Sequence, residues 1–435
     1  MSRPVHPLAA LAVLASCVAA GCGGATGGVS IPPPAKRLPT TASVPTTTTA
    51  AAPIVSTVKV GLERLDGAQG RSLVGKRVGL IANAASVTAT GKPALQVLRE
   101  HGIHVVRLFA AEHGLSAAAA AGEPVGGSVS RAQTRVVSLY EHGHMKPTRA
   151  DLHGLDALVY DMQDAGVRFY TFISTMIYAQ QAAAAAGVRF VVLDRPDPLG
   201  GERIAGPVAD LPESFVSVAP GPLVYGLTPG EMARVVQRRS VPRGRLLVVP
   251  MEGWRRTMTW ADTGRRWISP SPGLRSAQAA LLYPGIALLE GTTATEGRGT
   301  VAPFRIIGAP WAKVRRLLAA ASAPGVSASA RSFVPRPTAA VAEPKYSGRR
   351  CSGIALDVTN VADTFGLGLR LLHALRDQPG FDWLSDGANF DTLVGTRRVR
   401  RALDRGASVE AIIDSERADI AAWRRARMPA LLYPD

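Results

Sequence analysis

The chain has 435 residues, 46% of them hydrophobic and 19% charged, with 50 Lys and Arg against 33 Asp and Glu. This length exceeds one ordinary core, so two domains are expected, and the hydrophobic content excludes a mainly disordered protein. The net charge of +17 comes from scattered arginines without a nucleic-acid-binding motif, which leaves attraction to an anionic envelope polymer or a general Arg and Ala bias as its explanations.

The first 22 residues have the pattern of an export signal. Arg3 precedes an apolar run over residues 8–20, and small residues lead directly into Cys22. Small residues before a cysteine are typical of a bacterial lipobox, so lipidation at Cys22 is expected, with plain signal cleavage as the alternative. The apolar run is too short to cross a membrane as a stable helix. We therefore predict an exported protein, either a cell-envelope lipoprotein held to the membrane through Cys22 or a secreted one.

Residues 23–55 are rich in Gly, Pro, Thr and Ala and contain few large apolar side chains. Such a stretch cannot bury a core, so an extended tether is predicted. Of the three cysteines, Cys17 leaves with the signal, and Cys351 is then the one unmodified thiol. An intrachain disulfide is therefore excluded.

From residue 56, short β-branched runs alternate with helical periodicity. This alternation predicts an α/β fold with a doubly wound, mostly parallel sheet. Thr228 as N-cap, Pro229 at N1 and Glu231 at N3 form a capping box that marks the start of a helix. The predicted strands cover residues 77–82, 104–110, 136–140, 157–160, 188–193 and 245–250, with helices at 91–101 and 172–186.

The pattern becomes less regular from about residue 251, where we predict the boundary between a first domain (56–250) and a second (251–435). A loop rich in Trp, Ser and Pro covers residues 267–272, and a polar stretch covers 292–300. Further along, a strand is predicted at 353–358 and helices at 311–321, 367–376 and 407–427.

Polar side chains follow four of the predicted strands. In an open parallel sheet the carboxyl ends of the strands share one edge, and the ligand crevice lies outside that edge. Each group alone is more readily explained as a turn or a cap, but together the groups predict one polar cleft. The residues are Asn83, Glu112, His113, Asp161, Gln163, Asp164, Asp194, Arg195 and Asp197.

Glu112 stands out because it follows an apolar run and precedes Gly114, so it is expected at a partly desolvated strand end. Desolvation raises the pKa of a carboxyl group, as a general acid near neutral pH requires. The structural alternative is a carboxylate paired with one of the many arginines. For His113, a hydrogen-bonding neighbour is the simpler explanation.

The stretch 290–300 adds Glu290 and Glu296, with Arg298 between glycines. Polar residues flanked by glycine suit a loop that approaches a ligand closely, and a solvated surface loop is the alternative. The phosphate-binding patterns GxGxxG after the first strand and GxxxxGK[ST] are missing, as are HxxxH, CxxC and the GxSxG elbow. No cofactor, metal site or serine nucleophile is therefore expected.

With these motifs the chain resembles the exo-β-N-acetylmuramidase (NamZ-type) family, formerly a domain of unknown function, from about residue 60 to residue 433. Ordered motifs in both halves carry the resemblance. They are GLIAN at 79–83, EHGL at 112–115, SLY at 138–140, DMQD at 161–164, RFYT at 168–171, LDRP at 193–196, GLTPGE at 226–231, SPSP at 269–272, YPG at 283–285, LEGT at 289–292, EGRGT at 296–300 and GAPW at 308–311.

The resemblance implies a Rossmann-like first domain, a smaller α+β second domain and an active-site cleft between them. It implies release of N-acetylmuramic acid (MurNAc) from the non-reducing ends of peptidoglycan fragments, so MurNAc–GlcNAc oligosaccharides are the expected partners and nucleic acid is not. The family's EHG glutamate falls on Glu112, which we expect to act as general acid. The second catalytic group is left open among Asp161, Asp164, Glu290 and Glu296. The expected substrate-binding residues are Asn83, His113, Asp161, Gln163, Arg168, Tyr170, Asp194, Arg195 and Arg298.

Two positions depart from the family's pattern, since Asp197 and Gly273 stand where asparagine is usual. The three arginines at 168, 195 and 298 are expected as clamps for the lactyl carboxylate, because a guanidinium group binds a carboxylate bidentately.

Two other classes of protein remain open. A lipid-tethered binding protein would hold a sugar or muropeptide without turnover, and Glu112→Gln would leave its affinity nearly intact. A sugar-nucleotide transferase would use the same sheet edge, but nucleotide donors are scarce outside the cell.

Overall fold

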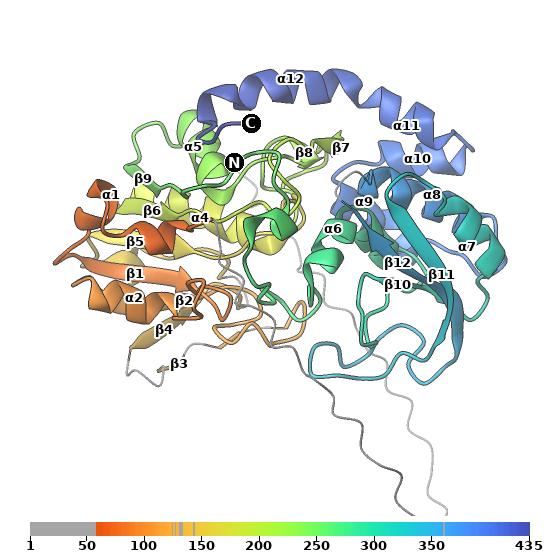
Figure 1. The fold of residues 1–435 in the computed structure, drawn as a ribbon, viewed down its shortest axis with the longest axis horizontal. Coiled ribbons are helices and arrows are strands. Elements are labelled where there is room, and N and C mark those ends of the chain that lie inside the picture. Colours follow the sequence, from red (N-terminus) through yellow and green to blue (C-terminus); the bar gives the residue numbers. More distant parts are fainter. Residues whose placement is uncertain (1–57, 124, 127, 130–133, 142–143, 360–361) are drawn as a thin grey trace, which may run out of the picture. The chain divides into compact units, whose positions relative to one another are not determined.

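The computed structural model describes residues 58–435 except 124, 127, 130–133, 142–143 and 360–361 (Figure 1). The predicted export signal, the predicted lipidation site at Cys22 and the predicted tether at 23–55 lie outside the described residues. Among the residues described, none of the helices combines the length and hydrophobicity that crossing a membrane requires.

The first part of the chain forms a seven-stranded sheet in which six strands are parallel and the short β3 pairs antiparallel with β4. Numbered along the chain, the six parallel strands lie in the order 3-2-1-4-5-6 of doubly wound sheets, so the predicted α/β fold is confirmed. In spatial order the strands are β3 (Ser128–Val129), β4 (Arg135–Ser138), β2 (His104–Ala110), β1 (Arg77–Ala82), β5 (Ala157–Asp161), β6 (Arg189–Leu193) and β9 (Leu246–Val249).

The central strands are continuous apolar runs because helices cover both faces of the sheet. One face packs against η1 (Gly61–Arg64), α1 (Ala68–Arg71) and α2 (Ala94–Glu100). The other face packs against α4 (Thr171–Ala185) and α5 (Pro229–Arg239). The predicted capping box of α5 is present, since the Thr228 hydroxyl accepts from the Glu231 amide at 3.2 Å and Glu231 accepts from the Thr228 amide at 3.1 Å.

The second part is built on a three-stranded antiparallel sheet in the order β10-β12-β11. Helices α6 and α8 cross on this sheet at two glycines that allow close approach. A Cβ atom on Gly285 would lie 1.9 Å from the Thr364 carbonyl oxygen, and one on Gly368 would lie 2.5 Å from Gly285 Cα. The elements are α6 (Ala277–Ile286), η3 (Ala287–Gly291), β10 (Ile306–Ala309), α7 (Val314–Ala320), β11 (Val326–Phe333), β12 (Cys351–Val358), α8 (Thr364–Arg376), η4 (Leu384–Gly387) and α9 (Ala388–Val394).

One prediction for the less regular regions was wrong, and one strand was missed. The helix predicted at 407–427 is two helices, which meet at Glu416, whose buried carboxylate faces Arg398 at 3.4 Å. Strand β11 was missed because its small polar side chains are mostly exposed and give no apolar alternation. The remaining elements are α3 (Arg149–Leu152), β7 (Ala205–Val208), β8 (Pro222–Val224), η2 (Trp260–Thr263), α10 (Arg398–Asp404), α11 (Val409–Ser415), α12 (Arg417–Arg427) and η5 (Met428–Ala430).

The C-terminal segment returns to the first sheet. Helix α12 packs on β7 and β8, and Trp423 donates from its indole nitrogen to the Tyr225 carbonyl at 2.9 Å (Figure 1). Beyond it, the Tyr433 hydroxyl donates to Asp194 at 2.5 Å, and the Leu432 amide donates to Glu231 at 2.9 Å. Residues 432 and 433 therefore complete the hydrogen bonding of Asp194, directly after β6, and of Glu231 in α5.

Candidate active site

The structure places the polar residues that follow β2, β1, β5 and β6 along one edge of the sheet. These four strands are neighbours and run parallel, so their carboxyl ends lie side by side. The side chains are buried, with exposed fractions between 0% and 8%. Proximity alone therefore does not separate residues that can meet a ligand from residues already committed to internal partners; the hydrogen bonds do.

Glu112 is held by three groups at the carboxyl end of β2. Its Oε1 accepts from the Gly122 amide at 2.8 Å, and its Oε2 is bonded to the Thr171 hydroxyl. Thr171 is the first residue of α4, so the carboxyl group lies at a helix N-terminus, where the helix dipole favours negative charge. The Tyr140 phenol is the third partner. Burial, and then the charge of Glu112 and this hydrogen bond, raise the pKa of Tyr140 and keep it protonated.

Tyr140 was missed as a site residue by sequence reasoning. The available signal was its place two residues beyond β4, the next parallel strand along the same edge, in the motif SLY. Its hydroxyl group adds a polar side chain from the end of β4 to the row that includes Glu112.

His113 shapes the loop that carries the Gly122 amide. Its backbone is left-handed, with φ 68°, and its Nδ1 lies 2.7 Å from the Ala119 carbonyl oxygen, which can only accept. Burial lowers the pKa of His113, although the charge of Glu112 acts in the opposite direction. The ring meets Phe172 edge to face at 6.2 Å. His113 thus stabilises the loop whose Gly122 amide donates to Glu112.

An aromatic row connects the Glu112 end of the sheet with the stretch 290–300. Tyr170 and Tyr283 meet edge to face at 5.9 Å, and Tyr283 meets Phe304 at 4.8 Å. The guanidinium of Arg298 lies 5.0 Å from the centre of the Phe304 ring. Burial, and then the charge of Glu290, raise the pKa of Tyr283. Residues far apart in the sequence therefore form one continuous row of contacts.

Three residues of the stretch 290–300 form a charged cluster with Lys345. Arg298 contacts Glu290 at 2.9 Å and Glu296 at 3.5 Å, and Lys345 contacts the other oxygen of Glu296 at 3.1 Å. Burial acts to raise the pKa of Glu296, but Lys345 and Arg298 outweigh it and lower that pKa, so this carboxylate stays ionised. Its side chain is 4% exposed, against 31% for Glu290. Of these two carboxylates, Glu290 is the one that can meet a ligand.

Lys345 was also missed by sequence reasoning. Besides Glu296, its ammonium group donates to the carbonyl oxygens of Leu289 at 2.9 Å, Ala294 at 2.9 Å and Glu290 at 3.3 Å. It therefore fixes the backbone on both sides of Glu290. Carbonyl acceptors leave no trace in a sequence, so no signal could have found this role.

Asp161 and Arg195 form a buried bidentate ion pair at the end of β5 and β6. The two bonds measure 2.6 and 2.9 Å, and both side chains are at most 3% exposed. Both oxygens of Asp161 are occupied by this pair, which argues against a role for Asp161 as the second catalytic group.

The structure does not bring Arg168 or Asp194 to the row of residues that runs from Glu112 to Arg298. Arg168 is fully buried and donates to the carbonyls of Pro207 at 2.8 Å, Gly221 at 3.0 Å and Val394. Burial lowers its pKa to about 10. Asp194 accepts from four donors, which are the amides of Arg195 and Gly230 and the hydroxyls of Thr228 and Tyr433. Both residues tie segments of the chain together. Both Asp194 oxygens are occupied, and the one Arg168 nitrogen without a partner, Nε, is buried away from solvent.

Asp164 and Asp197 form a buried carboxyl pair on either side of Gly166. The Gly166 amide donates to Asp164 at 3.0 Å, and a Cβ atom on Gly166 would lie 2.3 Å from Asp197 Oδ1. Asp164 also accepts from the Tyr225 hydroxyl. Burial raises the pKa of Asp164 to about 6 and raises the pKa of Asp197, which also faces the charge of Asp164. The pair is suited to holding a proton inside the fold.

Asp197→Asn is expected to make stability less dependent on pH. Because the folded-state pKa values of Asp164 and Asp197 are raised above 3.8, the folded chain holds protons that the unfolded chain releases. This stabilising contribution is fully present below about pH 3.8 and is lost as pH rises above it; for Asp164 the loss extends through about pH 6. An amide at position 197 cannot ionise, so the loss of stability between pH 5 and pH 8 should be smaller in Asp197→Asn than in the unmodified protein. Urea unfolding across this range measures it, and equal slopes for both proteins would contradict the expectation.

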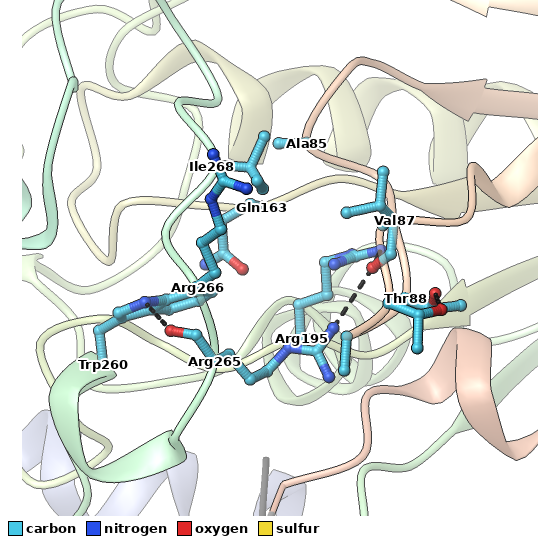
Figure 2. A pocket seen from close by; sticks show the side chains of 12 residues that line it. Ala85, Val87, Thr88, Gln163, Arg195, Trp260, Arg265, Arg266 and Ile268 are labelled. Carbon is cyan, nitrogen blue, oxygen red and sulfur yellow. Dashed lines mark hydrogen bonds between the residues drawn. The ribbon is translucent and has the colours of Figure 1, made fainter. Parts of the chain in front are cut away.

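The segment that contains the SPSP motif crosses the sheet edge. Asn83 donates to the Pro270 carbonyl at 3.1 Å, and Ser271 lies beside the Tyr170 phenol. Ile268, a few residues earlier, lines a separate pocket together with Gln163 and Arg195 (Figure 2). The predicted site residues thus fall into two groups, one around Glu112 and one in this pocket. Within the described part of the chain, no three His, Cys, Asp or Glu side chains gather closely enough to hold a metal ion.

The fold and this edge define a Rossmann-like α/β protein with a smaller second part. Two family models match the chain, exo-β-N-acetylmuramidase NamZ, N-terminal, over residues 78–278 and its C-terminal counterpart over residues 281–433. The chain belongs to the exo-β-N-acetylmuramidase NamZ family. Among curated relatives, the peptidoglycan β-N-acetylmuramidase NamZ of Bacillus subtilis (strain 168) is 38% identical over 388 residues, which cover 86% of this chain and 91% of that protein.

Two solved structures of DUF1343 family proteins from Bacteroides fragilis NCTC 9343 share the fold. They have TM-scores of 0.76 and 0.70 and sequence identities of 30% and 29%. Each comparison covers 87% of this chain and 99% of the other.

Proposed function

We propose that this protein is an exo-acting glycoside hydrolase that releases MurNAc from the non-reducing ends of peptidoglycan fragments. The observation that carries the proposal is the ordered carboxyl group of Glu112 at the sheet edge, connected by an aromatic row to the partly exposed Glu290–Arg298 pair. Support for the substrate comes from the family and from the B. subtilis relative, which carries the name peptidoglycan β-N-acetylmuramidase.

Glu112 is proposed to donate a proton to the glycosidic oxygen. Because Oε1 accepts an amide N–H, the proton of the neutral acid would be carried by Oε2. Its partner there is the Thr171 hydroxyl, which can accept as well as donate, so the same contact accommodates both states of the acid. Tyr140 fixes the carboxyl group from the side of β4.

Glu290 is proposed as the second carboxylate, which stabilises positive charge on the sugar in the oxocarbenium-like transition state. It is more exposed than Glu296, and the ion pair with Arg298 holds it in place. Arg298 is also the best placed of the three predicted clamps for the lactyl carboxylate, because its side chain is 20% exposed, whereas Arg168 is buried among carbonyls and the Arg195 side chain is 3% exposed.

The proposal is tested with the full chain and the disaccharide MurNAc–GlcNAc. Free MurNAc should be released from this substrate, whereas GlcNAc–MurNAc, with the sugars in the opposite order, should stay intact. A protein that binds MurNAc–GlcNAc but releases no MurNAc would instead be the lipid-tethered binding protein.

Lys345→Met is expected to lower kcat about tenfold or more with a small change in KM, because the backbone around Glu290 loses its common donor. Lys345→Arg keeps the charge opposite Glu296 and should retain more activity than Lys345→Met. Steady-state kinetics with MurNAc–GlcNAc measure both variants. Unchanged kcat in Lys345→Met would contradict the positioning role.

We also propose that the protein is exported and attached to the membrane by a lipid on Cys22. The support is the signal-like sequence of the first 22 residues, which ends in small residues and Cys22. Fractionation of cells that produce Cys22→Ala tests it. The variant should leave the membrane fraction, and a membrane-bound variant would count against lipidation.

A further inference from the structure

The pocket lined by Gln163 and Arg195 lies at the same edge of the sheet as Glu112. It is a cavity of about 120 Å³ lined by the turn that follows β1, by Gln163 and by three arginines, Arg195, Arg265 and Arg266 (Figure 2). The sheet order reverses between β1 and β5, and open α/β sheets bind ligands at this switch point. The pocket therefore lies where this fold class places ligands, and none of the side chains that contact Glu112 lines it.

The arginines carry more positive charge than their partners neutralise. Arg195 is paired with Asp161, and Arg265 is paired with Glu63 at 2.6 Å. Arg266 is exposed and has no carboxylate within ion-pair distance among the described residues. Three guanidinium groups thus face two carboxylates, which leaves one positive charge. Figure 2 shows the side chains of Arg195 and Arg266 around the same space.

Gln163 offers an acceptor to whatever occupies the pocket. Its Nε2 donates to the carbonyls of Asp164 at 2.9 Å and Pro196 at 2.8 Å, which fixes the orientation of the amide. The opposite atom, Oε1, is buried and has no hydrogen-bond partner in the described structure, although the side chain is only 2% exposed. A buried acceptor without a donor is costly, so this atom calls for an O–H or N–H group.

We propose that this pocket binds a compact oxyanion, a carboxylate or a phosphate, that also carries an O–H or N–H donor. The guanidinium of Arg266 takes the anionic oxygens and Gln163 Oε1 accepts from the donor. Thr88 and Thr90 line the same cavity and supply hydroxyl groups. The ligand is either a substituent of the glycan substrate or a free anion, and the two sources share this chemistry. The pocket is distinct from the site of the proposed hydrolysis.

The test measures binding, without turnover, to the full chain at constant ionic strength. Calorimetry is carried out with inorganic phosphate, D-lactate, MurNAc and neutral GlcNAc. We expect the three anions to bind and GlcNAc to bind more weakly than MurNAc. Arg266→Gln should weaken anion binding about tenfold or more, since it removes a charge-assisted hydrogen bond from an exposed side chain whose loss spares the fold.

Arg238→Gln is the matched control, because Arg238 is an exposed arginine on α5 that does not line the pocket. It should bind like the unmodified protein. Tighter binding of MurNAc than of D-lactate would assign the pocket to the glycan, and tighter binding of phosphate would assign it to a free anion. Anion binding that is absent, or equal in Arg266→Gln and the unmodified protein, would overturn the proposal. Glu112→Gln should keep anion binding, so a failure of the hydrolase proposal would be recognised separately.

Discussion

Replacing Glu112 by glutamine is expected to lower kcat/KM for MurNAc release about 10²–10⁴-fold, the usual contribution of a general acid. Glutamine has the same shape but carries no transferable acid proton. Its carbonyl oxygen can still accept from the Gly122 amide, and its NH₂ group can donate to the Thr171 hydroxyl, so the loop should remain in place. Release of MurNAc from MurNAc–GlcNAc is the measurement.

The control for this variant is Glu410→Gln, which removes an exposed carboxylate on α11. Its activity should equal that of the unmodified protein. Thermal unfolding of Glu112→Gln should stay close to that of the unmodified protein, which separates lost chemistry from lost folding. If Glu112→Gln kept most of the activity, the acid would have to be another residue.

Arg256→Met is expected to lower the free energy of unfolding by about 3–5 kcal/mol, as when one partner of a buried ion pair is removed. Arg256 contacts both oxygens of Glu231, at 2.7 and 2.9 Å, and donates to the carbonyls of Gly201 and Gly226. Glu231 is 0% exposed, so its charge would be left inside the fold without a cation. Urea unfolding at neutral pH measures the loss.

The neighbouring Arg255 provides the matched control, because it is exposed and Arg255→Met removes the same charge from the surface. That variant should change stability by less than about 0.5 kcal/mol. Adding Glu231→Gln to Arg256→Met should recover part of the loss, since the uncompensated charge disappears. Equal stability of the two arginine variants would show that the buried pair contributes nothing.

The doubly wound sheet could be predicted because its signal is local. Six apolar, β-branched runs are separated by helical segments, and each run became a strand with bounds close to the predicted ones. The capping box at Thr228 was equally local and is present. The shared edge of the polar residues followed from the parallel direction of the strands, which the alternation of strands and helices predicts.

The roles of individual polar residues could not be predicted, since they depend on partners far along the chain. Arg168 is committed to a carbonyl of Val394, and Asp194 to the hydroxyl of Tyr433, which is 239 residues away. The same limit applies to Lys345, whose acceptors are mainly backbone carbonyls. Sequence patterns predict which faces are apolar, but they do not predict which polar groups form hydrogen bonds with one another.

The docking of the C-terminal segment has a consequence for the order of folding during synthesis. Asp194 and Glu231 belong to the first sheet, yet Tyr433 and Leu432, near the end of the chain, supply donors to their buried oxygens. A ribosome-bound chain that has completed the sheet still lacks these donors, so the native network closes only after residues 432 and 433 have been synthesised. Deletion of residues 431–435 should therefore be poorly tolerated. A tag fused after Asp435, whose side chain is 84% exposed, should leave the network intact.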